Sequence, residues 1–314
     1  MSTTHGCDFF LDKSHGRPGF SAEITPSIRI RPGTGERLGF ETSDAVYAEL
    51  HQHHSLTELQ APINPVTGPV FVEGAAPGDA IAVTIHEIRL KEYGWSVSLP
   101  RCGALQHVMG EDIFTRRVPI DEYGVHLTNR VTVPAQPMIG CIGTAPAIGT
   151  ASTLMPSYFH GGNMDLVECR PGSTVYLPVQ VDGAYLAIGD IHAVMAEGES
   201  SFIAIEAEGV AVVSIDLVAG LGLRAPRVET DSEWIFVGLG DPVQDSIMRG
   251  YEDMFSFLVD VHGWTRDDAY VTLSAVGHSR LGGPTGSIAP NELHPFTPIG
   301  AVTTHRIPKS ILSV

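Results

Sequence analysis

SFIAIEAEGVAVVSIDLV, residues 201–218, is one of several β-prone runs that lie between residues 66 and 240. AIAVTIHEIRL (80–90) and STVYLPVQV (173–181) follow Pro-Gly pairs, which supply the fixed φ and then the positive φ of a type II turn. Asp182-Gly183 follows the second run with the two-residue spacing of a type I′ hairpin. Few segments in this region have a helical period. The sequence therefore predicts a mainly β fold with a β-sandwich or barrel-like core.

The carboxyl-terminal part has a different period. In DSIMRGYEDMFSFLVDVHG (245–263), apolar residues recur every three or four positions, which predicts an amphipathic helix that Gly263 can close. Thr265, with Asp268 three residues later, resembles a capping box that begins a second helix ending near Gly277. We therefore expect an α+β carboxyl-terminal portion whose helical hairpin packs against the sheet.

These patterns divide the 314 residues into amino-terminal strands packed on the core (1–65), a β-rich catalytic core (66–240) and the α+β portion (241–314). Within the first part, residues 24–44 suggest two strands around a Gly-rich turn. The cluster His51, His53 and His54 follows in a segment that is either loop or helix. Metal ligation by these histidines is one interpretation, but solvent exposure is favoured because no carboxylates are suitably spaced nearby.

Composition restricts the class of protein. The net charge of -17, from 36 acidic and 19 basic residues, disfavours nucleic acid and membrane surfaces as partners. The amino terminus lacks the pattern of a secretion signal, and no stretch of ~18 apolar residues occurs. The four cysteines are far apart and predict reduced thiols. We expect a cytoplasmic protein.

Two segments place ionisable residues among glycines. They are HGGNMD (160–165) and GDIHAVMAEGE (189–199). Gly161 and Gly162 allow the backbone to approach a ligand closely. Asp190 and His192 are two residues apart, so their side chains share one face of a strand.

Carboxylate and imidazole groups of this kind can bind a metal ion, and an unligated glutamate can then take a proton from water. A solvent-facing polar pair and a Gly-rich turn with an Asx cap explain the same residues without any chemistry. Spacing alone does not decide between these two interpretations.

The two segments also belong to a longer series of motifs: NPVTGPVFVEGAAPGDAIAVTI (64–85), PMIGCIGTAPA (137–147), HGGNMD, GSTVYLPV (172–179), GDIHAVMAEGE and IPKSIL (307–312). In this order they resemble the acetamidase/formamidase family, from about residue 40 to the end. The resemblance implies a β-rich fold with an α+β portion, no organic cofactor, a divalent metal, and hydrolysis of small amides to ammonia and a carboxylate.

The resemblance also assigns residues by position. Asn163 and Asp165 match GGN-x-D, Asp190 and His192 match GD-x-H, and Glu199 and Glu73 match the acidic residues of G-E and V-E-G. We expect metal ligation by His160, Asp165 and His192, with Asp190 as a ligand or as the carboxylate that orients an imidazole. Glu199 is the expected general base. Glu73 is either catalytic or a turn carboxylate, and Gly161, Gly162 and Asn163 are expected to contact substrate.

The chain departs from the family pattern at three places. AEGE (196–199) stands where G-D-G-E is usual, which introduces Glu197, and GHSRLGG (277–283) introduces His278 and Arg280. The segment 282–298 has no assigned role. Arg280 and His278 are either incidental surface charges or a recognition site for a carboxylate-bearing amide.

Partners and rival functions follow from the same reasoning. We expect zinc, with calcium as the alternative, a small amide substrate, and a homodimer as the commonest oligomer. Covalent amidase mechanisms are disfavoured because their motifs are missing. The rival function is a non-catalytic β-rich protein that binds a metal or a small ligand on the same scaffold.

Overall fold

A computed structural model describes residues 6–154, 159–240, 242–283 and 301–313. Its strands are β1 (Phe9–Leu11), β2 (Gly16–Arg17), β3 (Gly19–Ser21), β4 (Ile28–Ile30), β5 (Leu38–Glu41), β6 (Val66–Val72), β7 (Ala80–Ser98), β8 (Phe114–Asp121), β9 (Gly124–Thr128), β10 (Val131–Val133), β11 (Met138–Gly143), β12 (Thr150–Ser152), β13 (Gly161–Asn163), β14 (Thr174–Pro178), β15 (Leu186–Val194), β16 (Ile205–Val218), β17 (Arg227–Glu229), β18 (Glu233–Gly240), β19 (His278–Leu281) and β20 (Ala301–Pro308). Its α-helices are α1 (Ala45–His53), α2 (Gln106–Met109), α3 (Val243–Ser256) and α4 (Arg266–Val276). Short 3₁₀ helices span Lys13–His15 and Lys309–Ser313.

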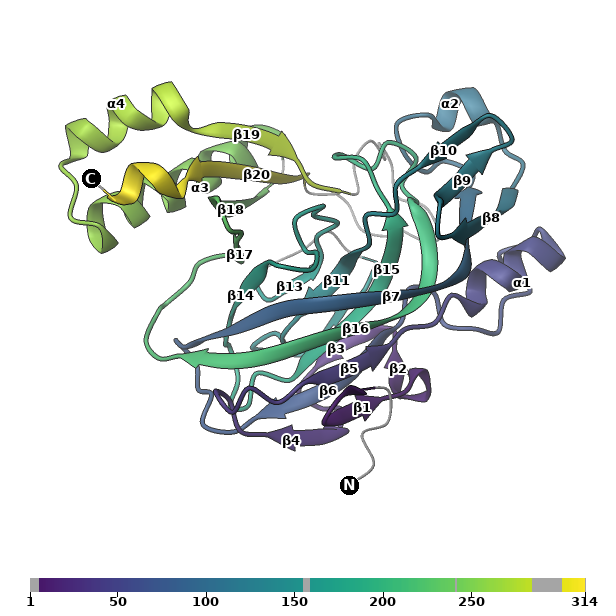
Figure 1. The fold of residues 1–314 in the computed structure, drawn as a ribbon, viewed down its shortest axis with the longest axis horizontal. Coiled ribbons are helices and arrows are strands. Elements are labelled where there is room, and N and C mark those ends of the chain that lie inside the picture. Colours follow the sequence, from purple (N-terminus) through teal and green to yellow (C-terminus); the bar gives the residue numbers. More distant parts are fainter. Residues whose placement is uncertain (1–5, 155–158, 241, 284–300, 314) are drawn as a thin grey trace.

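The long strands β7 and β16 organise the sheet. They pair antiparallel along most of their length, with Val83 opposite Ile215 (Figure 1). Strand β16 also pairs with β5 and β15, and β15 continues the network to β6 and β11. The predicted mainly β class is confirmed, although the strands do not close into a barrel.

The turns match the sequence prediction in part. Gly78 and Gly172 have φ values of 96° and 92°, as the predicted Pro-Gly turns require, and the strands that follow them pair with each other. The predicted type I′ hairpin at Asp182-Gly183 is wrong. Strand β14 pairs with β7 and β17, and the Gly183 amide donates to Ala75 O at 2.8 Å. Long-range backbone pairing therefore replaces the local hairpin.

Burial of apolar side chains divides into several clusters. The largest lies among the central strands and includes Phe40, Ile85 and Ile142. A second cluster joins α1 to β7 through Leu50 and Trp95, and it borders the site described below. Several central strands are buried on both faces, since β11 is buried along its whole length and β6 and β15 along most of theirs.

The carboxyl-terminal helices confirm the predicted hairpin. Thr265 caps α4 by accepting a hydrogen bond from Asp268 N at 3.1 Å, and Gly263 has a φ of 70°. The end of the first helix differs from the prediction, because Phe257–Val261 forms a π-helical turn. Helix α3 packs on β18 and β20, to one side of the central strands (Figure 1).

The amino-terminal part contains the two predicted strands, β4 and β5, but they pair with other strands and not with each other. The cluster His51, His53 and His54 lies at the end of α1 and is exposed. The division at residues 65 and 240 stays a prediction. All four cysteines are buried and outside disulfides. In the described ranges, no helix is both long and apolar enough to cross a membrane.

Candidate active site

Four neighbouring segments bring five ionisable side chains together. His192 on β15 lies directly opposite Glu206 on β16, and Asp190 precedes His192 on the same strand. Asp165 follows β13, and Glu199 lies in the turn after β15. The side chains are almost completely removed from solvent, with 1–6% exposure. We call these five residues the acid cluster.

His192 is the centre of the acid cluster. Its Nε2 atom lies 3.2 Å from Asp190 Oδ1 and 3.2 Å from Glu206 Oε1, and 3.9 Å from Asp165 Oδ1. The ligand atoms of Asp190, His192 and Glu206 lie within 4.8 Å of one another, as do those of Asp165, His192 and Glu199. Two overlapping carboxylate–imidazole groups therefore share one histidine.

Burial and mutual repulsion dominate the electrostatics. Burial raises the pKa of Asp165 and Glu199 well above the ordinary range, and neighbouring carboxylates add to the shift. Burial also raises the pKa of Glu206 to about 7. Burial alone would lower the pKa of His192, but Glu206 and Asp190 raise it well above its usual value. The carboxylates cannot all ionise unless more positive charge is present.

The backbone at three of the carboxylates is strained. Asp165, Asp190 and Glu199 have φ values of 45°, 58° and 37°, in the left-handed region, which is uncommon for residues other than Gly and rarer for Glu than for Asp. Such strain persists only where the surroundings hold it, and it is concentrated at functional sites. Each of the three carboxylates belongs to one of the two groups that share His192.

Two glycines make room for these carboxylates. A Cβ atom on Gly140 would lie 2.4 Å from Asp165 Oδ1 and 2.5 Å from Asp190 Oδ2. A Cβ atom on Gly283 would lie 2.8 Å from Asp165 Cβ and 3.0 Å from Glu199 Cβ. The segment after β19 therefore packs directly against the acid cluster.

Asn64 fixes the orientation of one carboxylate. Its side-chain amide lies within hydrogen-bond distance, 3.3 Å, of both Asp190 Oδ2 and Asn163 Oδ1, and it donates to Thr153 O at 3.1 Å. These contacts join the segment before β6 to β13 and β15. Asn163 thus contacts the site through Asn64.

A cavity of about 40 Å³ opens beside the acid cluster. One side is polar and includes Asn64, Asn163 and the acid cluster, whereas the other side is apolar and comes mainly from α1 and the loop after it. Tyr47 lies on this boundary, where burial and the nearby carboxylate of Glu206 raise its pKa well above the usual value. The cavity is partly open, and this volume accommodates about three water molecules.

The structure brings together most of the residues that the sequence suggested, but not all. Asp165, Asp190, His192 and Glu199 belong to the acid cluster. Gly161 and Gly162 are buried in β13, where they pair with β11.

Other suggested residues lie apart from the acid cluster. Glu73 is 47% exposed and pairs with Arg31. His160 is buried against Phe20, and burial lowers its pKa to about 4. Arg280 pairs with Glu197 at 2.6 Å and borders a different groove. Residues 284–300 lie outside the described ranges.

Sequence reasoning missed Glu206, Asn64 and Tyr47. Glu206 had only a weak signal, because it is one of three carboxylates in the largely apolar run of β16. Asn64 and Tyr47 had none, since their contacts depend on how distant segments pack.

The acid cluster fits a divalent cation. Asp165 Oδ1 is buried without a hydrogen-bond partner in the described structure. The two 3.2 Å spacings at His192 match ligands of a tetrahedral ion bonded at 2.0–2.1 Å, which lie about 3.3 Å apart. Four carboxylates beside one imidazole also supply the negative charge that a cation would neutralise.

The fold and site define a mainly β protein with a buried carboxylate–histidine centre and a small cavity. The chain belongs to the acetamidase/formamidase family, which it matches over residues 12–154 and 147–283.

Individual relatives agree with this assignment. The chain is 25% identical over 305 residues to an acetamidase of Mycolicibacterium smegmatis, covering 69% of this chain and 72% of that protein. A predicted acetamidase/formamidase from Thermoanaerobacter tengcongensis has a similar structure, with a TM-score of 0.85, 29% identity and 97% of each chain covered. An acetamidase from Bacillus halodurans has a TM-score of 0.86 and 27% identity, covering 97% and 98% of the two chains.

Proposed function

We propose that this protein hydrolyses the C–N bond of a small amide to ammonia and a carboxylate. Family membership supports this reaction, and so do the names of the relatives described above. The observation that carries the proposal is the acid cluster, which places acid/base groups and cation ligands at the wall of a cavity of about 40 Å³.

Asp165, Asp190, His192 and Glu206 would hold a divalent cation, which we propose to be zinc, with calcium as the alternative. When bound, such an ion polarises the amide carbonyl and makes water more acidic. The spacing around His192 and the unpartnered oxygen of Asp165 support this ligand set.

Glu199 is the proposed general base. It takes a proton from the attacking water and transfers it to the departing amine, which cannot leave as an amide anion. Its place beside Asp165 and His192 supports this role. Asn64 holds Asp190 in position by its side-chain amide. Asn163, which contacts the same amide of Asn64, is the proposed residue that orients the substrate. Glu73 and His160, which lie apart from the acid cluster, have no step in this mechanism. The cytoplasmic location and the homodimer stay predictions.

Metal analysis together with an ammonia-release assay tests the proposal. We expect about one equivalent of a divalent metal per chain, and turnover of formamide or acetamide that chelation abolishes and the same metal restores. Full activity in a sample shown to be metal-free would contradict the ligand assignment. If metal-bound protein hydrolysed none of the primary amides, lactams and amino-acid amides tested, the non-catalytic binding function would be favoured instead.

A further inference from the structure

Glu199 lies in a short and strained turn. The Glu199 amide donates to Ala196 O at 3.1 Å, and the Phe202 amide donates to Glu199 O at 2.9 Å, so two tight turns follow each other after β15. Gly198, Glu199 and Phe202 have positive φ values, of 85°, 37° and 72°. Two of these three residues are not glycine, and such a backbone persists only where neighbouring segments hold it. We call residues 196–202 the base turn.

The segment after β7 holds one side of the base turn. The Ala104 amide donates to Ser200 O at 2.8 Å. A Cβ atom on Gly103 would lie 2.6 Å from the carbonyl carbon of Ser201, so the two backbones are in close contact there. These contacts lie after Glu199 in the chain, so the residues before it need a second support.

An ion pair supports the other side of the base turn. Arg280 on β19 contacts Glu197, with 2.6 Å between Arg280 Nη1 and Glu197 Oε1. The two side chains are 49% and 34% exposed, so the pair lies at the surface, where both residues line a groove. Both residues belong to the stretches that depart from the family pattern. The pair is therefore a feature that the family resemblance does not supply.

The segment that carries Arg280 also reaches the acid cluster. Three residues after Arg280, the Gly283 amide donates to Asp165 O at 3.2 Å. A Cβ atom on Gly283 would lie 3.0 Å from Glu199 Cβ, so Gly283 packs against the proposed general base. Strand β19 and the residues after it therefore touch the base turn twice, at Glu197 and at Glu199.

We propose that Arg280 is a positioning residue: its ion pair with Glu197 ties β19 to the base turn and so holds Glu199 in the strained conformation from which it accepts a proton. This role rests on the amide hydrolysis and on the function of Glu199 proposed above. It differs from recognition of a substrate carboxylate, because the Arg280 guanidinium is already paired and lines the groove and not the cavity.

The exposure of the ion pair sets the size of the expected effect. An exposed pair shifts an equilibrium by up to about fivefold, so Arg280→Gln should lower kcat by about two- to fivefold. Arg280→Glu adds repulsion from Glu197, so kcat should fall by about tenfold. KM and metal content should change little, because neither the cavity lining nor a proposed metal ligand is altered. Ammonia release from acetamide and elemental analysis would measure these quantities.

Reversal of both charges tests the ion pair itself. The double variant Arg280→Glu with Glu197→Arg restores a pair of opposite polarity, so its kcat should return to within about twofold of the wild type. Added salt provides an independent measurement, because exposed pairs are screened. With rising KCl, the wild-type kcat on uncharged acetamide should fall toward that of Arg280→Gln, which should itself stay nearly constant.

A second mutant cycle tests whether Arg280 acts through Glu199. In the Glu199→Gln background, Arg280→Glu should lower kcat by less than about twofold, because the group that it positions is already absent. The same tenfold loss in both backgrounds would show that Arg280 acts elsewhere and would overturn the positioning role.

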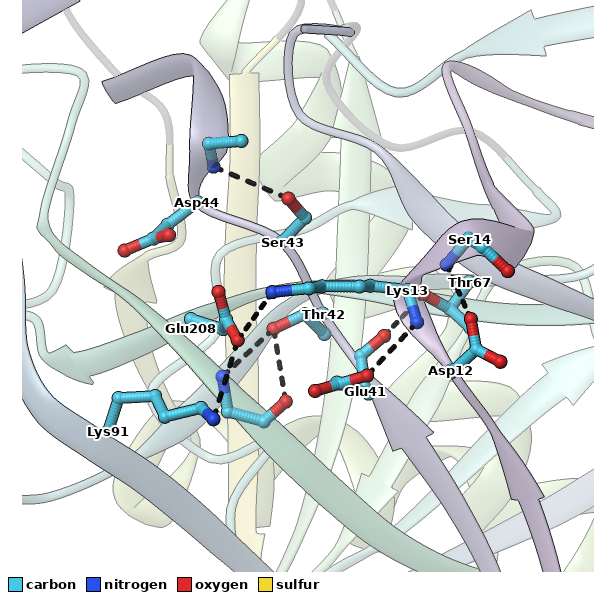
Figure 2. A network of polar contacts seen from close by, with 12 residues as sticks. Asp12, Lys13, Ser14, Glu41, Thr42, Ser43, Asp44, Thr67, Lys91 and Glu208 are labelled. Atoms are coloured by element: carbon cyan, nitrogen blue, oxygen red, sulfur yellow. Dashed lines mark hydrogen bonds and ion pairs between the residues drawn. The ribbon is translucent and has the colours of Figure 1, made fainter. Parts of the chain in front are cut away.

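Figure 2 shows a second surface ion pair, which supplies a control. Lys13 Nζ lies 2.8 Å from Glu208 Oε1, and the lysine is 45% exposed, close to the value for Arg280. This pair joins the segment before β2 to β16, and Lys91 also approaches Glu208, at 3.6 Å. Lys13→Gln removes an ion pair that does not involve the base turn and should leave kcat unchanged. Arg170→Glu, which reverses an arginine on the same groove as Arg280, should do the same.

The outcomes keep the two proposals apart. Wild-type kcat in folded Arg280→Glu, or a charge swap that does not restore kcat, would overturn the positioning role while amide hydrolysis stands. A raised KM with unchanged kcat would also overturn it, since Arg280 would then contact substrate. If Arg280→Glu does not fold, Arg280→Gln and the salt dependence of the wild type decide the same question. Metal-replete wild-type protein that hydrolyses no amide would overturn both proposals.

Discussion

The acid cluster and the ion pairs near the carboxyl-terminal helices are both buried, yet their charges are arranged differently. Arg227 donates to both oxygens of Asp253, at 3.0 and 2.7 Å, and Arg306 donates to Glu168. Each of these carboxylates has a guanidinium partner. The acid cluster instead has four carboxylates and one imidazole. A buried carboxylate paired with a guanidinium is already balanced, whereas the carboxylates of the acid cluster must either take up protons or bind a cation.

The largest expected effect is loss of the ligands of the acid cluster. His192→Ala and Asp165→Ala should each remove the metal and lower turnover by at least about 10⁴-fold, because positioning and electrostatic stabilisation are lost together. Elemental analysis and ammonia release would measure both quantities. His51→Ala, in the exposed histidine cluster, should keep the metal, and its loss there would place the metal site elsewhere.

The next largest effect tests whether Glu199 in the acid cluster is the general base or a metal ligand. Glu199→Gln should keep the fold and the metal but lower kcat by about 10² to 10⁴, the usual contribution of a general acid/base. If the variant lost its metal, Glu199 would be a ligand, and the proton transfer would pass to another carboxylate. Near-normal kcat with metal retained would remove Glu199 from the chemistry.

Breaking a balanced pair should affect stability and not chemistry. Asp253→Ala leaves the buried Arg227 guanidinium unpaired, so unfolding in urea should show a loss of about 3–5 kcal/mol. The activity of the folded fraction should be unchanged. The double variant Arg227→Met with Asp253→Leu should recover most of the stability, since both charges are then absent. A drop in kcat per folded molecule would contradict a purely structural role.

The sequence predicted the features that depend on residues close together in the chain. Alternation on a strand placed Asp190 beside His192, and the Thr265 cap predicted the start of α4, because neighbours a few residues away determine both. Glu206 joins His192 through strand pairing across 14 positions of the chain, and the failed hairpin at Gly183 shows the same limit. The apolar side of the cavity depends on the packing of α1 against β7, which no local pattern encodes.

The smallest expected effect compares two buried histidines. Carboxylates contact His192, whereas the ring nitrogens of His305 contact the hydroxyls of Ser279 and Thr303, at 2.8 and 2.9 Å. Burial lowers the pKa of His305 from 6.5 to about 4. Below pH 6.5 the unfolded chain therefore gains a proton that the folded chain does not, so stability present above pH 6.5 is lost as the pH falls toward 4.

This loss should reach about 2 kcal/mol by pH 5 and about 3 kcal/mol at pH 4. Urea unfolding at pH 7, 6 and 5 would measure it, with His305→Gln as the variant that lacks the titrating group. Other groups also titrate in this range, so the informative quantity is the difference between the two proteins. The variant should be less stable at pH 7, because it loses the packing of the ring, but its stability should fall less steeply with acid. Parallel curves for the two proteins would show that His305 binds a proton as readily in the folded state as in the unfolded chain.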